Sequence, residues 1–166
     1  MSDHQNPRES AGPAKASARP GSDTELDDFI CFAVYESNLA FNNLYRSLLG
    51  DLGLTYPQYL VMTLLWRRDR RTVREIGDAL SLEYNTLTPM IKRLEALGLV
   101  SRVRDEQDQR VVNVTLTTEG TALQEKARKI PQCIAEATGL SVPELKDLKA
   151  RLDTLRSNLR SGGGQE

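Results

Sequence analysis

The chain has 166 residues, of which 39% are hydrophobic and 27% charged, and its formal net charge is −1. This length accommodates one well-packed domain rather than two large ones. The near-neutral charge argues against a protein that coats nucleic acid by bulk charge, although it is compatible with a local basic surface. No apolar run approaches the roughly 18 residues that span a bilayer, and the N-terminus lacks the apolar core of a secretory signal. We therefore expect a cytoplasmic protein without membrane contact.

Composition and helix signals divide the chain into a central module and two helical regions. Residues 55–117 carry the pattern of a winged helix-turn-helix, and residues 22–54 and 118–160 predict the helices of a dimerisation region. Residues 1–21 and 161–166 lack apolar periodicity, which predicts a disordered N-terminal tail and a flexible C-terminal tail. The expected fold class is mainly α with a small β-wing.

The first helix carries the signal for a homodimer. A capping box at Ser22 and Glu25 predicts that this helix starts there, runs to Leu49 and stops at Gly50. Residues 30–35 are apolar on every side of the helix. A helix that is apolar on every side must be buried on every side, and one small domain can bury only one of its faces. We therefore expect a second copy of the chain on the other face, in a dimer built from the N- and C-terminal helices.

Capping signals place three further helices. In chain order these run from Thr55-x-x-Gln58, with Pro57, to the Arg67–Arg71 cluster, from Thr117 to Gly139, and from Ser141-x-x-Glu144, with Pro143, to Leu159. The arginine cluster fits either a solvated helix terminus or a phosphate contact. Leucines recur at three and four residues in the last helix, which fits packing on its own core or pairing with a partner chain.

The module itself is predicted by one continuous run of signals. A capping box at Thr72 and Glu75 opens a short helix, a second helix is predicted over Leu82–Leu97, and Gly98 ends it. Two alternating strands then flank a charged turn at residues 105–109. This order sets an exposed helix beside a basic hairpin, which fits a duplex with the helix in the major groove. We therefore expect double-stranded DNA as a partner.

Polar and basic side chains of the second helix are the candidates for contact with base edges and phosphates. They are Tyr84, Asn85, Thr86, Thr88, Pro89, Lys92 and Arg93. An N-cap is the alternative role for Asn85, whereas the core is the expected place of Met90, Ile91, Leu94 and Leu97. In the hairpin the candidates are Arg102, Arg104, Asp108 and Arg110. An arginine at a loop tip suits a narrow minor groove, where the negative potential is strongest.

Two cysteines, Cys31 and Cys133, are the other candidates for chemistry. The chain has no C-x-x-C pair, and its only histidine is His4. This donor set argues against a structural zinc site, so we expect no metal and no cofactor. Composition alone favours two small buried apolar residues at these positions.

The hairpin also carries a family signature. The run from Asp108 and Arg110 to Leu116 and Thr117 resembles the D-x-R-x-x-x-x-x-L-T signature of MarR-type regulators. The flanking helices resemble the dimerisation domain of that family, and the resemblance covers roughly residues 25–160. It implies a homodimer on a pseudo-palindromic operator, with Arg110 in the minor groove and Asp108 helping to orient the wing.

A second resemblance lies in the first two helices. The segments Cys31–Tyr35 and Gly53–Met62, together with Tyr45, resemble the OhrR branch of organic-hydroperoxide sensors, and Thr86–Glu95 resembles its recognition helix. In that branch, tyrosines fourteen and twenty-five residues beyond a reactive cysteine reach it from the partner subunit, and here those offsets lead from Cys31 to Tyr45 and Tyr56. Phenolic O–H groups stabilise a thiolate. Tyr35 is a third candidate for this support.

The OhrR resemblance implies a mechanism. An organic hydroperoxide would oxidise Cys31 to sulfenic acid, Cys133 would close an intersubunit disulfide, helped by local loosening at Pro131, and a repressor would leave its DNA. The triplet at residues 83–85 is Glu-Tyr-Asn where that branch carries Asp-Ser-Gly, which implies a different operator. Two alternatives stay open: a MarR-type repressor released by a small aromatic ligand, with structural cysteines, and a thiol peroxidase. Nothing else resembles a catalytic site, so we expect no enzyme.

Overall fold

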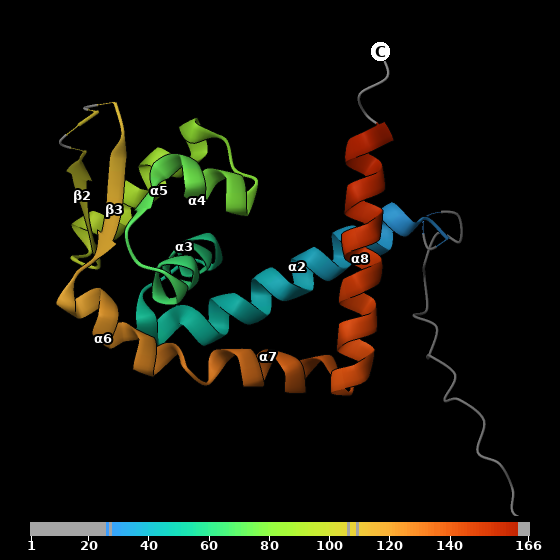
Figure 1. Ribbon diagram of the computed structural model, residues 1–166. Coiled ribbons are helices and arrows are strands. Elements are labelled where there is room, and N and C mark those ends of the chain that lie inside the picture. The colour runs from blue at the N-terminus through green and yellow to red at the C-terminus, as the bar shows by residue number, and fades with distance from the viewer. Residues whose placement is uncertain (1–25, 27, 106, 109, 163–166) are drawn as a thin grey trace, which may run out of the picture. The chain divides into compact units, whose positions relative to one another are not determined.

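A computed structural model describes residues 26, 28–105, 107–108 and 110–162 (Figure 1). The chain forms two units, residues 1–39 and 40–166. The elements in chain order are α2 (Ile30–Leu49), the 3₁₀ turn η1 (Gly50–Leu52), α3 (Tyr56–Arg67), β1 (Arg71–Thr72), α4 (Val73–Leu80), α5 (Tyr84–Ala96), β2 (Val100–Arg104), β3 (Val112–Leu116), α6 (Thr118–Ala127), α7 (Ile130–Thr138) and α8 (Val142–Gly162). No described helix is long and apolar enough to cross a bilayer.

Helix α2 starts later than predicted and ends at the predicted residue. It begins at Ile30, while the expected capping box at Ser22 and Glu25 lies outside the described residues. At its other end the chain continues past Gly50 as the turn η1, and Gly53, with φ 65°, redirects it. Helix α2 ends at Leu49, so its predicted end before Gly50 is confirmed, while the left-handed residue that redirects the chain is Gly53.

The capping boxes that start α3 and α4 are confirmed. At α3 the Thr55 N–H donates to the Gln58 side chain at 2.8 Å, with Pro57 in the first turn. At α4 the Thr72 hydroxyl accepts from the Glu75 N–H at 3.1 Å, and the Glu75 carboxylate accepts from the Thr72 N–H at 2.7 Å. Each box satisfies backbone donors that the first helical turn leaves open, so the starts of both helices are defined locally.

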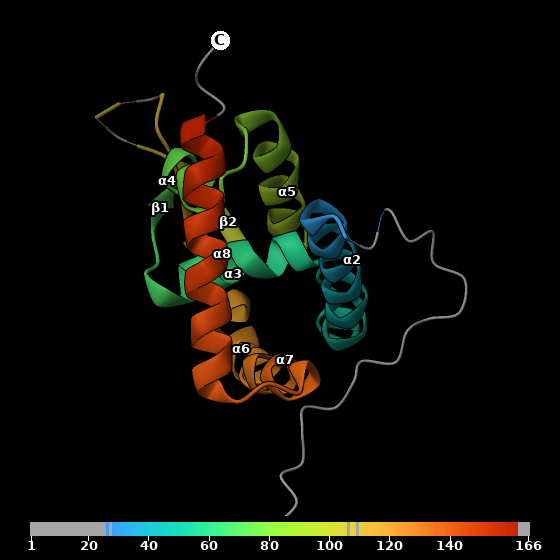
Figure 2. The same ribbon diagram turned by 90° about the vertical axis from the view of Figure 1, so that its right-hand side faces the viewer.

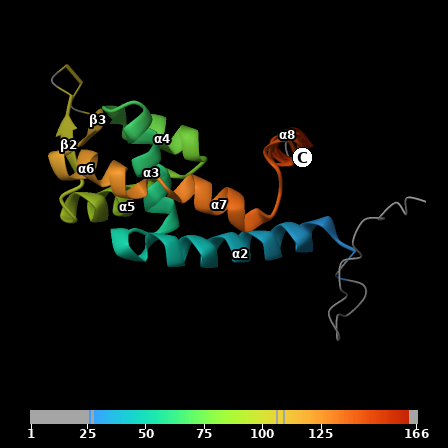
Figure 3. The same cartoon turned by 90° about the horizontal axis from the view of Figure 1, so that it is seen from below.

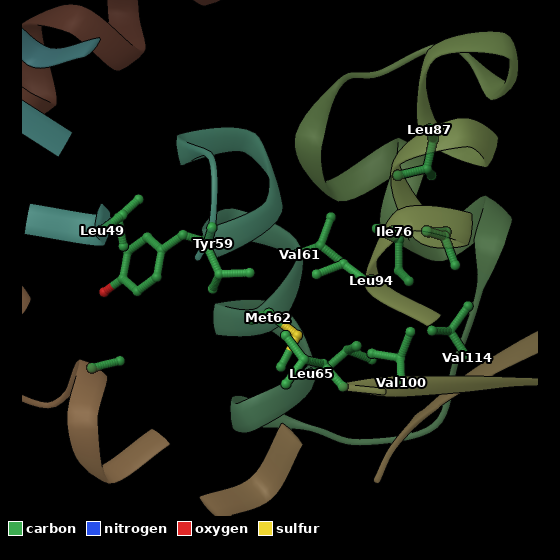
Figure 4. Close-up of a cluster of buried hydrophobic side chains, with 14 of the residues drawn as sticks. Leu49, Tyr59, Val61, Met62, Leu65, Ile76, Leu87, Leu94, Val100 and Val114 are labelled. Atoms are coloured by element: carbon green, nitrogen blue, oxygen red, sulfur yellow. The ribbon is translucent and has the colours of Figure 1, made fainter. Parts of the chain in front are cut away.

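The core of the second unit lies among α3, α4, α5 and the sheet. Figure 4 shows its labelled members: Leu49, Tyr59, Val61, Met62, Leu65, Ile76, Leu87, Leu94, Val100 and Val114. They come from helices and strands alike, and all except Tyr59 are at most 2% exposed. Full burial of such a side chain stabilises the fold by about 1.5–3 kcal/mol. This core fixes α5 beside α4, as Figures 1 and 2 show.

The sheet has three antiparallel strands in the order β1-β3-β2, and Figure 3 shows the β2–β3 hairpin extending beyond the helices around it. Residues pair from Val100 with Leu116 to Arg104 with Val112. Strand β1 was not predicted, since two residues carry no readable alternation. An Asp69 carboxylate oxygen accepts from the Leu116 N–H at 2.8 Å, which attaches the loop before β1 to β3.

After β3 the described part of the chain forms three helices rather than the predicted two. Thr117 caps α6 by accepting from the Gly120 N–H at 2.9 Å, as expected, but the helix ends at Ala127 and α7 begins at Ile130. Pro131 explains the break, because its ring lacks an N–H and clashes with the carbonyl four residues back. Gly139 ends α7 with φ 66°, as predicted.

Helix α8 begins with the predicted capping box. The Ser141 N–H donates to the Glu144 carboxylate at 2.8 Å, and the Ser141 hydroxyl donates to the same oxygen at 2.6 Å. The helix extends to Gly162, two residues into the segment that was expected to be flexible. None of its residues is buried, and Leu152 and Leu159 are 46% and 68% exposed.

Candidate redox site and nucleic-acid interface

Helix α5 has one face buried in the core and one face exposed to solvent. Leu87, Ile91 and Leu94 are at most 1% exposed and attach the helix to the core. Six of the seven residues predicted to meet DNA are exposed: Tyr84, Asn85, Thr86, Pro89, Lys92 and Arg93. The helix therefore presents an aromatic ring, an amide, a hydroxyl and two cations to solvent.

Three predictions for this helix need correction. Glu83 occupies the N-cap, so the alternative role of Asn85 as N-cap was wrong. The Thr88 hydroxyl is buried and has no hydrogen-bond partner among the described residues, so in this conformation it does not reach a base edge. Leu97, expected in the core, is 52% exposed because the helix ends at Ala96 and Leu97 caps it.

Arg102 of the hairpin is engaged within the protein. Its guanidinium Nε and Nη2 each lie 2.7 Å from Oε2 of Glu95 in α5. The Arg102 backbone N–H also donates to Oε1 of Glu95 at 3.2 Å. Both side chains are about one-third exposed, which makes this pair stronger than a fully solvated one. Arg102 therefore braces β2 against α5 in addition to any contact it makes with DNA.

Two aspartates organise the turn of the hairpin. Asp105 accepts from the Gln107 and Asp108 N–H groups at 3.0 and 3.3 Å and from the Asn113 side chain at 3.1 Å. These hydrogen bonds lower the pKa of the Asp105 carboxyl. Asp108 accepts from the Arg110 N–H at 2.9 Å, which agrees with the orienting role that the resemblance implies. Asp105 was missed, although an aspartate at a turn start is a known signal.

Arg104 and Arg110 lie on either side of the organised turn, and both are exposed to solvent. Arg110 lies with Tyr84 of α5 and Arg74 of α4 along a cavity of about 370 Å³. The two parts of the expected DNA interface, helix and hairpin, are thus adjacent in the second unit. In the cluster at residues 67–71, Arg68 pairs with Glu75 and Arg71 donates to the Arg68 carbonyl at 3.2 Å, so these two side chains support the loop.

Two of the predicted thiolate-supporting tyrosines meet in the second unit. The rings of Tyr45 and Tyr56 stack with centroids 3.9 Å apart and an interplanar angle of 17°. Burial, together with the nearby hydroxyls of Tyr56 and Tyr59, raises the pKa of Tyr45 to about 12. Tyr45 therefore keeps its proton at neutral pH and can donate a hydrogen bond to an anion. Tyr35 lies in the first unit and is 57% exposed.

An aromatic chain that was not predicted extends from this pair. The Tyr59 ring centroid lies 5.9 Å from that of Tyr45 and 6.1 Å from that of Trp66, edge to face in the second contact. Trp66 Nε1 donates to the Gly120 carbonyl in α6 at 2.8 Å. A Cβ at Gly120 would lie 1.9 Å from the Leu99 carbonyl oxygen, so only glycine permits this approach.

The chain of contacts ends at the boundaries of the module. The Gly120 N–H donates to the Thr117 hydroxyl at 2.9 Å, and that hydroxyl donates to the Gly98 carbonyl at 2.6 Å. Thr117 directly follows β3, and Gly98 directly follows the cap of α5. A continuous path of rings and hydrogen bonds therefore joins the tyrosine pair to the ends of α5 and β3, the two elements predicted to face DNA.

The two cysteines are free thiols in different units. Cys31 is exposed and is the second residue of α2, in the first turn of the helix. The positive end of a helix dipole is felt in that turn, where it stabilises an anion. Cys133 is half-buried in α7, and its N–H donates to the Lys129 carbonyl at 3.0 Å. Among the described residues no cluster of three or more histidine, cysteine or acidic side chains could hold a metal ion.

Comparison with known proteins gives the family. A family model described as transcriptional regulator SarA/Rot matches residues 43–127. TtmR, an HTH-type transcriptional regulator of Methylorubrum extorquens, is 44% identical over 84% of this chain and 71% of its own. The organic hydroperoxide resistance transcriptional regulator of Bacillus subtilis is 43% identical over 81% of this chain and 92% of its own.

The chain belongs to the SarA/Rot and MarR family of winged-helix transcriptional regulators.

Solved structures of AbfR, a protein of Staphylococcus epidermidis, show the same fold. Reduced AbfR bound to DNA has a TM-score of 0.72 and 34% identity, over 86% of this regulator and 98% of AbfR. Disulfide-formed AbfR has a TM-score of 0.60 and 36% identity, over 80% and 93%. The regulator is thus a mainly α winged-helix protein of the DNA-binding OhrR/MarR type.

Proposed function

We propose that this regulator is a repressor that an organic hydroperoxide releases from DNA by oxidising Cys31. The observation that carries the proposal is the stacked pair of Tyr45 and Tyr56, whose Tyr45 phenol stays protonated as a hydrogen-bond donor. Two comparisons support it. The Bacillus relative is named for organic hydroperoxide resistance, and AbfR is known in a reduced form on DNA and in a disulfide form.

The active form is a homodimer on a pseudo-palindromic operator. In the first unit Phe29 and Ile30 are 54% and 68% exposed, and in the second unit Leu152 and Leu159 of α8 are 46% and 68% exposed. Exposed apolar faces of this kind mark protein–protein contacts. A second copy covers them with the same surfaces by two-fold symmetry, which also sets two copies of α5 against two half-sites.

The reaction starts at the Cys31 thiolate. The sulfur attacks the terminal oxygen of the hydroperoxide, the O–O bond breaks, and the remaining alkoxide takes a proton and leaves as the alcohol. The sulfur becomes sulfenic acid. The partner's Tyr45 and Tyr56 stabilise the thiolate beforehand by hydrogen bonding. Apolar neighbours such as Phe29, Phe32 and Val34 favour a hydroperoxide with an alkyl substituent over hydrogen peroxide.

A disulfide then completes the switch. The Cys133 thiol attacks the sulfenic sulfur, an S–S bond forms between subunits, and water leaves. Because a disulfide needs Cα atoms within about 7 Å, closing it displaces α2 or α7. The path through Tyr59 and Trp66 carries that displacement to Gly120 and from there to the ends of α5 and β3. The two half-site contacts then lose their match.

Non-reducing electrophoresis with mass spectrometry tests the chemistry. Treatment with cumene hydroperoxide should give a covalent dimer with a Cys31–Cys133 link, and Cys31→Ser should give none. Cys133→Ser should stop at sulfenic acid on Cys31, which a sulfenic-acid trap reports. Peroxide-treated protein that keeps both thiols reduced would contradict the proposal and favour release by a small ligand. Sustained turnover with excess peroxide and thiol would instead indicate a peroxidase.

A further inference from the structure

A cavity of about 280 Å³ lies in the second unit, between the end of α2 and the start of α3. Its walls are Asn42, Arg46, Leu54, Thr55, Tyr56 and Pro57. Tyr56, one of the two stacked phenols, therefore faces a space that also holds a guanidinium. Leu54 and Pro57 supply an apolar wall between polar groups. The cavity thus combines a cation, a phenol and an apolar surface, which fits an amphiphilic ligand.

Arg46 is the one cation of this cavity. Its side chain is exposed, and the described part of the chain provides it with no ion pair. Arg46 lies in the last turn of α2, where its positive charge complements the helix dipole. That role requires only that the charge lie near the helix end. It does not account for the shared cavity with Tyr56. A guanidinium with free donors binds carboxylates in a bidentate geometry.

We propose that Arg46 binds a carboxylate on the hydroperoxide, so that the regulator senses carboxylate-bearing alkyl hydroperoxides in preference to neutral ones. The inference rests on the proposed function of the Tyr45–Tyr56 pair. The carboxylate lies at Arg46, the alkyl chain follows Leu54 and Pro57, and the peroxide group reaches the phenol end of the cavity. Oxidation of Cys31 proceeds as above, and the alcohol product keeps its carboxylate.

The test compares the full-length reduced protein with three variants. Arg46→Gln removes the charge, Arg46→Lys keeps it without the bidentate fork, and Arg128→Gln is the matched control at an exposed arginine of the α6 end that pairs with Glu125. The probes are a medium-chain hydroperoxy fatty acid, its methyl ester and cumene hydroperoxide. The readout is the rate of Cys31 oxidation.

Wild type and Arg128→Gln should react with the acid roughly fivefold faster than with the ester, as a partly exposed charge-assisted contact allows. Arg46→Gln should lose this preference, Arg46→Lys should keep part of it, and the cumene rate should be the same in all four proteins. An acid-to-ester ratio in Arg46→Gln equal to that of wild type would overturn the inference.

Binding of the matching hydroxy fatty acid, which cannot oxidise sulfur, gives a second readout. Wild type should bind it roughly fivefold more tightly than Arg46→Gln, and equal affinities would overturn the inference. This measurement separates the two failures, because it reports on Arg46 even if no hydroperoxide oxidises Cys31. Failure of every hydroperoxide to oxidise Cys31 would contradict the proposed sensor itself.

Discussion

Trp66→Phe tests the path from the tyrosine pair to α5 and β3, the elements predicted to face DNA. The substitution keeps an aromatic ring beside Tyr59 and removes the indole N–H that donates to the Gly120 carbonyl at 2.8 Å. A neutral hydrogen bond contributes about 1 kcal/mol, and a buried acceptor left without a partner costs about 1–3 kcal/mol. Gly120 is buried while Trp66 is only half-buried, so water partly replaces the lost donor. We expect the free energy of unfolding to fall by about 2 kcal/mol.

Urea denaturation followed by circular dichroism at fixed protein concentration measures this change. Thr121→Val is the control. Thr121 lies in α6, next to Gly120, and the substitution removes the hydrogen bond that its exposed hydroxyl donates to the Thr117 carbonyl. Its effect should stay below about 0.5 kcal/mol. In the oxidised state Trp66→Phe should retain more DNA than wild type. A Trp66→Phe protein as stable as the control, and released from DNA like wild type, would refute the path.

Three further predictions concern the wing, the tyrosine pair and the packing of α6. Arg110→Ala should weaken DNA binding by roughly 1–2 kcal/mol and reduce the salt slope by about 1 in fluorescence titrations, and an unchanged slope would remove Arg110 from the interface. The raised pKa of Tyr45 favours the neutral phenol in the folded state, so its contribution to stability is complete below about pH 10 and is lost as pH rises toward 12. Urea midpoints of Tyr45→Phe should therefore fall less than those of wild type over that range, and parallel curves would contradict the shift. Gly120→Ala should destabilise the protein by roughly 2–3 kcal/mol or more because its Cβ meets the Leu99 carbonyl. A Gly120→Ala protein with the same free energy of unfolding as wild type would show that α6 moves freely.

Local signals predicted the parts of the fold whose causes are local. The helix starts at Thr55, Thr72, Thr117 and Ser141 were all correct, because each depends on hydrogen bonds within four residues. The left-handed end at Gly139 was correct for the same reason. The break between α6 and α7 was signalled by Pro131, but that proline was read as a local loosening rather than a helix boundary.

Features that depend on distant residues could not be predicted. Strand β1 exists because β3 pairs with Arg71 and Thr72, some forty residues away in the chain. Burial of the Thr88 hydroxyl depends on how α5 rests on the sheet. The contact between Trp66 and Gly120 joins α3 to α6 and leaves no periodic mark in either helix.

The candidate site was predicted in part. The offsets from Cys31 selected Tyr45 and Tyr56 through a family resemblance, and these two rings stack. Tyr59 and Arg46 were missed, since neither carried a signal of its own in the sequence. Their roles depend on packing around the pair, which only the folded arrangement of α2 and α3 provides.

Fluorescence anisotropy of labelled operator DNA tests the central claim most directly. Reduced wild type should bind the DNA, a stoichiometric dose of organic hydroperoxide should release it, and dithiothreitol should restore binding. Cys31→Ser should bind equally well and stay bound after the same dose. Wild type that holds the DNA after Cys31 is fully oxidised, or Cys31→Ser that is released to the same extent, would contradict the account.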